Sequence, residues 1–167
     1  MKEQPTRKPN RLSEYDYSTP GSYFITICTY QKKKLLSDIT VGEGLAPPAV
    51  RYSEIGKIAE QQLLLLPERF PQLTLAHYVI MPNHIHILFT LRKDENAGGA
   101  SPSPTVIDAV RCFKSLTTRL ARPFCGEDAL FQRSFHDHVI RNDADYREIW
   151  NYIDTNPARW STDCFYE

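Results

Sequence analysis

Residues 73–91 read LTLAHYVIMPNHIHILFTL, and this stretch predicts a β-hairpin at the centre of the fold. Residues 73–80 and 84–91 are rich in β-branched and aromatic residues, which favour strands. The turn between them is Met81-Pro82-Asn83. Because side chains alternate along a strand, one face of residues 84–91 enters the core, namely the face of Ile85, Ile87 and Phe89.

The opposite face of the same strand carries two histidines, His84 and His86. Two imidazoles about 7 Å apart along a strand can hold one cation if a third ligand comes from elsewhere. The alternative is a pair of half-exposed sheet histidines without a ligand, which is the commoner case for this spacing. A second pair, His136 and His138, alternates in the same way on another predicted strand, so spacing alone does not separate the two pairs.

The remaining elements place the hairpin in the middle of an α+β fold. Apolar periodicity and capping residues predict, in chain order, a strand at 23–30, a helix from Ser53 to Pro67, a helix at 105–122, a strand at 135–140 and a helix at 143–155. With the hairpin, the order is β-α-β-β-α-β-α. It predicts a ferredoxin-like antiparallel four-stranded sheet with helices on one face, followed by an added C-terminal helix.

The length of 167 residues is typical of one domain and allows a substantial hydrophobic core. We expect three segments: a basic N-terminal arm at residues 1–19, a single domain at residues 20–160 and a C-terminal tail at residues 161–167. Glycines and prolines between Gly42 and Pro48 predict an irregular stretch. Residues 92–104 are polar and lack an apolar period, which predicts disorder.

Composition excludes several classes of protein. No apolar run approaches the roughly 18–20 residues that a membrane span needs, and the polar N-terminus is unlike a secretory signal. The four cysteines form no CxxC pair, which argues against a zinc knuckle and predicts reduced thiols in a cytoplasmic protein. Lys and Arg total 20, as do Asp and Glu, so any nucleic-acid site must come from local clustering of cations.

The helix predicted at residues 143–155 carries a tyrosine beside its apolar stripe. At about 100° per residue, the packed side consists of Tyr146, Ile149, Trp150 and Ile153. Tyr152 lies off that stripe, and Asn156 follows it by one turn. Two interpretations stay open. Tyr152 is either an aromatic side chain that only covers the edge of the packed side, or a phenolic nucleophile with Asn156 contributing an oxygen to a bound metal.

Three ordered motifs resemble those of a known family. They are YVIMPNHIHIL at residues 78–88, HVIRN at residues 138–142 and YIDTNP at residues 152–157. Together they resemble the single-tyrosine HUH transposases, and among these most of all the REP-associated tyrosine transposases and related transposase-like proteins. The opening stretches at residues 11–18 and 21–29 agree, so the resemblance covers about residues 7–160.

The resemblance implies a ferredoxin-like fold and a metal-dependent reaction on DNA. In the family, the HUH histidines bind a divalent cation, Mg²⁺ or Mn²⁺, and a helix tyrosine attacks single-stranded DNA. Carried onto this chain, His84 and His86 are metal ligands and Tyr152 is the catalytic nucleophile. Asn156 is the third metal ligand, at a position where the family often has Gln.

The implied function is transposition. The enzyme would cleave and rejoin single-stranded DNA through a covalent 5′-phosphotyrosine, acting on hairpins such as palindromic repeats, as a monomer or a homodimer. Two alternatives stay open: a host-retained single-strand endonuclease, and a catalytically silent nucleic-acid-binding module on the same fold.

Cations cluster in places that suit DNA binding. Residues 110–125 contain four cations and no acid, and the side opposite the expected apolar stripe of Ala109, Phe113, Leu116 and Leu120 carries Arg111, Lys114 and Arg122. Arg11 in the N-terminal arm and Arg141 before the tyrosine helix complete the predicted DNA contacts. Tyr15, Tyr17 and Tyr23 are candidates for stacking on unpaired bases. The alternative is that these cations only face the solvent and do not contact DNA.

Overall fold

The computed structural model describes residues 15–40, 47–93 and 105–165. Its main sheet contains β1 (Gly21–Cys28), β4 (Leu73–Ile80), β5 (His84–Leu91) and β6 (His136–Ile140). The strand order is β4-β5-β1-β6, and every neighbouring pair is antiparallel. The predicted α+β class and the four-stranded antiparallel sheet are therefore confirmed.

The register places both histidines of β5 in the interior of this sheet. In the pairing of β1 with β5, Cys28 lies opposite His84 and Thr26 lies opposite His86. On its other edge β1 pairs with β6, where Phe24 lies opposite His138. Because β5 has a partner on each side, the backbone around the histidines is fixed by two hydrogen-bond ladders.

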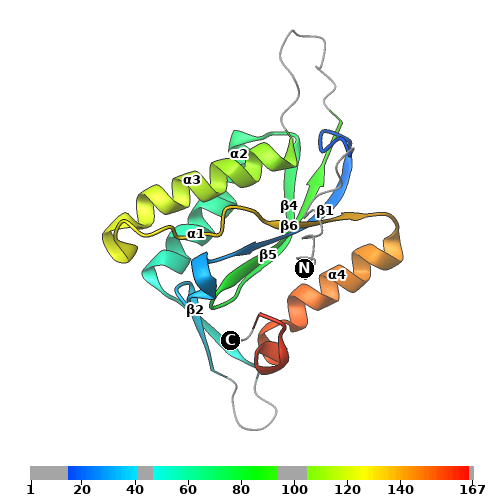
Figure 1. Cartoon of the computed structure of the whole chain (residues 1–167). Helices are drawn as coiled ribbons and strands as arrows, with labels where there is room; N and C mark the ends of the chain where they lie inside the picture. Colours follow the sequence, from blue (N-terminus) through cyan, green and yellow to red (C-terminus); the bar gives the residue numbers. More distant parts are fainter. Residues whose placement is uncertain (1–14, 41–46, 94–104, 166–167) are drawn as a thin grey trace, which may run out of the picture.

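Helices cover both faces of the sheet (Figure 1). Helices α1 (Glu54–Leu64) and α3 (Val106–Cys125) cover one face, and their apolar side chains share the larger core with Ile25, Ile87 and Phe89. Helix α4 (Asp143–Thr155) covers the opposite face over a smaller core that contains Leu88 and Ile153. The expectation of helices on one face holds for α1 and α3, and α4 is the added helix.

Helix α1 begins where the sequence predicts. Its N-cap is Ser53, whose hydroxyl accepts a hydrogen bond from the N–H of Gly56 at 3.1 Å. A Cβ atom at Gly56 would lie 2.0 Å from the carbonyl oxygen of Leu36, so only glycine allows this close approach. Pro67 was expected to end the helix, but it lies in the first turn of a further short helix, α2 (Leu66–Arg69), where proline is tolerated.

Helix α3 differs from the expectation in which face is buried. Its N-cap Thr105 forms a capping box with Asp108, which fixes its start. The buried residues along it include Ala109, Phe113, Thr117 and Ala121, whereas Leu120 is 43% exposed. The predicted stripe through Leu120 was wrong in its last turn because two smaller residues, Thr117 and Ala121, occupy the inner side of the helix.

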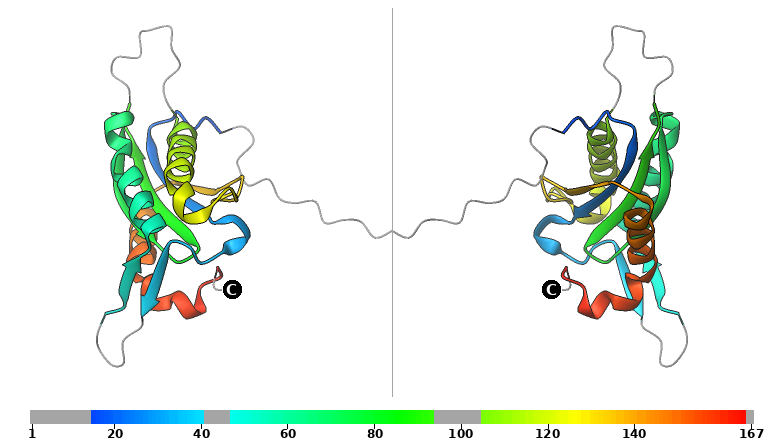
Figure 2. Two further views of the ribbon diagram at one scale, coloured as in Figure 1. Left: turned by 90° about the vertical axis from the view of Figure 1, so that its left-hand side faces the viewer. Right: turned by 90° about the vertical axis from the view of Figure 1, so that its right-hand side faces the viewer.

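A second, two-stranded sheet that the sequence did not predict flanks the stretch expected to be irregular. Strands β2 (Ser37–Thr40) and β3 (Ala49–Tyr52) pair antiparallel, and residues 41–46 between them lie outside the described ranges. The predicted disorder at residues 92–104 also lies largely outside them. Short helical segments η1 (Tyr30–Lys32) and η2 (Pro157–Thr162) complete the fold. Figure 2 shows the β2–β3 hairpin and η2 at the same end of the molecule.

Two of the tyrosines expected to stack on bases belong to the core. Tyr17 is 6% exposed and Tyr23 is fully buried, and the hydroxyl of Tyr17 donates to the carboxylate of Asp137. That expectation was wrong for both residues. Tyr17, at the end of the predicted arm, packs into the larger core, and Tyr23 faces the same core from β1. Within the described ranges no helix is long and apolar enough to cross a membrane.

Candidate functional site

The two histidines of β5 point away from the larger core and are covered by other residues. The rings of His84 and His86 lie with their centroids 4.5 Å apart, and their side chains are buried (0% and 1% exposed). Strand alternation is the cause, because Ile85, Ile87 and Phe89 take the opposite face. The predicted shared face is confirmed, but the pair is buried rather than half-exposed.

A neighbouring side chain orients each imidazole. Nδ1 of His84 donates to Oδ1 of Asn83 at 2.8 Å, which leaves the lone pair on Nε2. Nδ1 of His86 lies 2.8 Å from the hydroxyl of Thr26, the residue opposite it on β1. Hydrogen bonds of this kind fix the ring and the tautomer of metal-ligating histidines.

Burial keeps both rings neutral. It lowers the pKa of His84 to about 4, against an opposing effect of the carboxylate of Asp163. It also lowers the pKa of His86 well below the usual value, and the neighbouring His84 acts in the same direction. A neutral imidazole keeps a free lone pair, which is the form that binds a metal.

Helix α4 is held against the sheet at both ends. Ile153 is buried, and Tyr146, Ile149 and Trp150 contact the smaller core beside it, as the predicted stripe requires. Near its N-terminus Asp145 lies 2.9 Å from Nε2 of His138. Near its C-terminus Asp154 lies 2.6 Å from Nε2 of His77, whose ring stacks on Trp150.

Tyr152 projects from α4 to the histidine pair. Its hydroxyl lies 3.4 Å from Nε2 of His86, and its ring meets His86 and Phe24 edge-on. Burial raises the pKa of Tyr152 to about 12, and the negative charge of Asp163 adds to this. The phenol is therefore protonated at neutral pH while no cation lies beside it.

Asn156 follows one turn after Tyr152 and is buried (2% exposed). Its Nδ2 donates to Oδ2 of Asp163 at 2.8 Å, and Oδ1 of the same carboxylate accepts from the backbone N–H of Phe165. Asn83 in turn donates from Nδ2 to the carbonyl of Phe165 at 2.7 Å. These bonds tie the C-terminal segment to the histidine strand.

The site has the ligand atoms that a divalent cation needs. One ligand atom from each of His84, His86 and Asp163 lies within 4.8 Å of the other two. Among the described residues, Nε2 of His84 and Oδ1 of Asn156 are buried without a hydrogen-bond partner. An unpaired buried polar atom is costly, and a bound cation would satisfy both. The mixed imidazole and oxygen set therefore fits a metal ion.

Asp163 was not among the predicted ligands, since it falls in the stretch expected to be a C-terminal tail. No spacing in the sequence links it to the histidines, because it reaches them through η2. Asn156, the predicted third ligand, lies beside it.

The predicted DNA contacts are spread over the surface. Arg111 is exposed on α3, 3.8 Å from Asp108, and Arg122 is exposed near the end of the same helix. Lys114 donates to the backbone carbonyls of Gln132 and Arg133. Arg141 is exposed before α4, and Arg11 lies outside the described residues. Among the described residues of this set, Lys114 and Arg122 line one common cavity, whereas Arg111 and Arg141 do not line it.

The second histidine pair does not join the first. His136 and His138 lie on β6 at the edge of the sheet, and both are exposed. Nε2 of His138 lies 2.9 Å from the carboxylate of Asp145, so this histidine links β6 to α4.

Comparison with known proteins gives the family. No protein-family model matches the chain. An uncharacterised protein of Haemophilus influenzae is 30% identical over 173 residues, which cover 96% of this chain and 93% of that protein. A REP-associated tyrosine transposase of Escherichia coli is 28% identical over 85 residues, which cover 49% of this chain and 42% of that protein. The chain belongs to the same family as the Haemophilus influenzae protein. Over about half of its length it is similar to the REP-associated tyrosine transposase.

Solved structures of transposases share its fold. A REP-associated tyrosine transposase bound to a REP hairpin superposes with a TM-score of 0.61 at 23% identity, covering 89% of this chain and 74% of that one. A candidate transposase of Deinococcus radiodurans R1 gives a TM-score of 0.50 at 18% identity, covering 87% of this chain and 95% of that one. At these identities the likeness shows the fold alone.

Proposed function

We propose that this protein is a transposase that cleaves and rejoins single-stranded DNA, with Tyr152 as the nucleophile. The observation that carries the proposal is the 3.4 Å distance between the Tyr152 hydroxyl and Nε2 of His86, next to a cluster suited to a metal. The similarity to REP-associated tyrosine transposases supports the same reaction class. We interpret the strand order β4-β5-β1-β6 as the ferredoxin-like arrangement.

We assign the metal ligands as His84 and His86, with Asp163 and Asn156 supplying oxygen. A divalent cation held there, Mg²⁺ or Mn²⁺, would neutralise the non-bridging oxygens of the scissile phosphate. Asn83 and Thr26 orient the imidazole rings, and burial keeps them neutral. Because imidazole nitrogens suit Mn²⁺ better than Mg²⁺, we expect Mn²⁺ to bind more tightly.

Tyr152 performs the covalent step. The phenol loses its proton, and its oxygen attacks the phosphorus of the phosphodiester in line with the leaving 3′ oxygen. A bond forms between Tyr152 and the 5′ phosphate, and the 3′ oxygen leaves and takes up a proton as a hydroxyl. Rejoining is the reverse reaction, in which a 3′-hydroxyl attacks the phosphotyrosine, so that the bond energy is kept and no nucleotide cofactor is consumed.

The DNA partner is proposed as a single strand or a hairpin. A related transposase has been solved with a REP hairpin, and hairpin ends present a single strand beside a duplex stem. We place the protein in the cytoplasm, where such DNA occurs in a bacterial cell. A monomer accounts for the reaction, because α4 already brings Tyr152 to the histidines of its own chain.

Covalent trapping tests the proposal. A 5′-labelled and a 3′-labelled DNA hairpin with single-stranded flanks are incubated with protein and Mn²⁺, and the products are separated on a denaturing gel. We expect label attached to the protein only when it lies downstream of the cut, because the 5′ phosphate stays on Tyr152.

Tyr152→Phe should abolish the adduct. Tyr146→Phe is the matched control, since this second tyrosine of α4 contacts the smaller core instead of the histidines. Retained DNA binding without any adduct from the unaltered protein would contradict catalysis and favour a silent binding module.

A further inference from the structure

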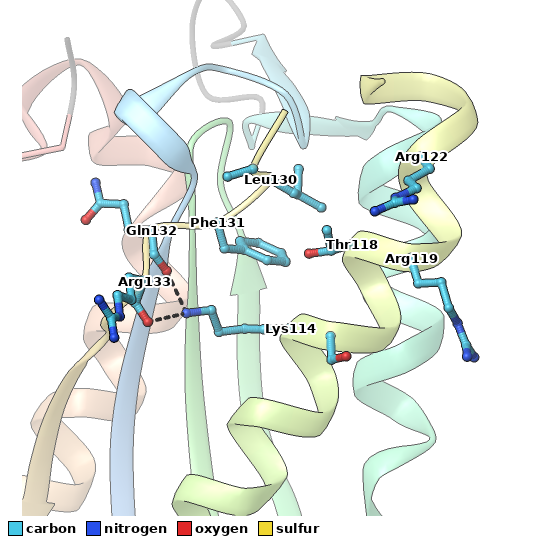
Figure 3. A pocket seen from close by; sticks show the side chains of 10 residues that line it. Lys114, Thr118, Arg119, Arg122, Leu130, Phe131, Gln132 and Arg133 are labelled. Carbon is cyan, nitrogen blue, oxygen red and sulfur yellow. Dashed lines mark hydrogen bonds between the residues drawn. The ribbon is translucent and has the colours of Figure 1, made fainter. Parts of the chain in front are cut away.

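A cavity of about 590 Å³ lies beside the second half of α3, outside the site described above. Its walls are α3 and residues 129–133, which run alongside the end of β1 (Figure 3). Four of its ten lining residues are cationic, namely Lys114, Arg119, Arg122 and Arg133, and none is acidic. The cavity is thus a place of concentrated positive charge in a chain whose formal net charge is zero.

The wall formed by residues 129–133 is fixed before any ligand arrives. The N–H of Tyr30 donates to the carbonyl of Leu130, and the N–H of Gln132 donates to the carbonyl of Cys28, both at 2.9 Å. Lys114 reaches across from α3 and donates to the carbonyls of Gln132 and Arg133 at 2.6 and 3.0 Å (Figure 3). Lys114 therefore supports the wall, and the cavity needs no rearrangement to form.

The three arginines of the cavity have free guanidinium groups. Within the described ranges, the side chains of Arg119, Arg122 and Arg133 form no hydrogen bond or ion pair, and all three are exposed. By contrast, Arg111 on the same helix lies 3.8 Å from Asp108. These three exposed arginines border one hollow that has no acidic residue in its lining, so an anion placed there would be attracted to them.

The chemistry of the lining selects a phosphodiester backbone as the anion. Guanidinium groups bind phosphate oxygens through paired N–H donors, and Thr118 lines the same space with a hydroxyl. Base stacking is not offered, because Phe131, the aromatic residue of the lining, is only 6% exposed. Recognition here would therefore be of phosphates and independent of sequence.

The cavity cannot hold the phosphate that is cleaved. Helix α3 covers the face of the sheet that carries Ile25 and Ile87, whereas His84 and His86 lie on the opposite face. The two regions are connected through the end of β1, where Cys28 bonds Gln132 and lies opposite His84. A DNA molecule that reached both would pass around this end of the sheet.

We propose that this cavity binds the sugar–phosphate backbone of the DNA substrate at a position outside the cleaved bond, through Arg119, Arg122 and Arg133. The inference rests on the proposed function and adds a second contact region to it. The cavity contributes affinity for long or hairpin DNA and takes no part in the covalent step.

The test compares Arg119→Gln/Arg122→Gln with a control that removes the same charge elsewhere. The control is Arg51→Gln/Lys57→Gln, since both residues are exposed and lie on β3 and α1. Binding of a fluorescent DNA hairpin with single-stranded flanks is measured by anisotropy at several salt concentrations. Because backbone contacts are independent of sequence, any hairpin serves as the probe.

We expect Arg119→Gln/Arg122→Gln to bind the hairpin at least about fivefold more weakly, and the slope of log affinity against log salt to fall by about two. The control should match the unaltered protein, and thermal unfolding should be unchanged in both. Equal affinity and slope in the two double variants, or no hairpin binding by the unaltered protein, would overturn the proposal. Covalent trapping on a short single strand is measured in a separate experiment. If Tyr152 forms no adduct there, the comparison of hairpin binding between the two double variants still tests the cavity.

Discussion

Replacing the carboxylate of Asp163 tests the assignment of the metal ligands. Asp163→Asn keeps the size of the side chain and one oxygen that can accept a hydrogen bond, but removes the negative charge. In the structure this carboxylate shares a 4.8 Å cluster with His84 and His86 and accepts bonds from Asn156 and Phe165. Mutating residues that merely support a metal ligand weakens binding by about 10–100-fold, and loss of a charged ligand should cost at least as much.

The loss of Mn²⁺ affinity in Asp163→Asn can be measured as a smaller stabilisation of the folded protein by Mn²⁺. At a Mn²⁺ concentration about 100 times its dissociation constant, binding of Mn²⁺ raises the free energy of unfolding of the unaltered protein by about 2.7 kcal/mol. If Asp163→Asn binds Mn²⁺ about 10–100-fold more weakly, the same Mn²⁺ concentration raises its free energy of unfolding by only about 0.4–1.4 kcal/mol. For a chain of this size, about 1 kcal/mol moves the unfolding midpoint by roughly 2–4 °C. The expected shift with Mn²⁺ is therefore about 5–11 °C for the unaltered protein and about 1–6 °C for the variant.

Thermal unfolding with and without Mn²⁺ measures this shift of the unfolding midpoint directly. Asp128→Asn is the control, because Asp128 is exposed, pairs with Lys33 and is not part of the His84, His86 and Asp163 cluster. Its shift with Mn²⁺ should equal that of the unaltered protein. A full shift in Asp163→Asn would exclude Asp163 as a metal ligand and leave His84, His86 and Asn156 as the protein ligands.

Three further predictions concern the fold that holds the site. Ile153→Ala should lower the free energy of unfolding by about 2–4 kcal/mol, because the side chain is 1% exposed under α4; an unchanged urea midpoint would contradict this. Gly56→Ala should destabilise the protein severely, since its Cβ would meet the carbonyl of Leu36 at 2.0 Å; soluble protein with unchanged circular dichroism and melting would count against it. Bonds from Thr105 lower the pKa of Asp108, so the stability it contributes is present at neutral pH and disappears as pH falls through that lowered pKa. Asp108→Asn should accordingly be less stable than the unaltered protein at pH 7, and the gap should close on acidification; a gap that stays constant down to pH 2 would exclude this cause.

The elements with strong periodicity were predicted with the bounds that the structure has. Strands β4 and β5 and helix α4 begin and end at the expected residues, because hydrophobic alternation or helical spacing persists through each of them. The strands of the β2–β3 hairpin are four residues long and flank a stretch of glycines and prolines, so no period was long enough to reveal them.

The face of α3 could not be predicted fully, because packing selects by fit as well as hydrophobicity. Ala121 and Thr117 are buried where α3 lies close to its neighbours, and Leu120 is displaced toward solvent. The residues of the candidate site also differ in whether the sequence could predict them. One strand and one helix supply His84, His86 and Tyr152, which local patterns could identify, whereas Asp163 arrives through the turn of η2.

The most direct test is to identify the residue that becomes attached to DNA. Protein incubated with a single-stranded DNA and Mn²⁺ is digested with nuclease and trypsin, and modified peptides are sequenced by mass spectrometry. Cleavage after Arg147 and Arg159 yields residues 148–159, in which Tyr152 is the only tyrosine, while Tyr146 falls in the preceding peptide. We expect a nucleotide attached through its 5′ phosphate to Tyr152. An adduct on another residue, or no adduct in protein that binds the strand, would exclude Tyr152 as the nucleophile.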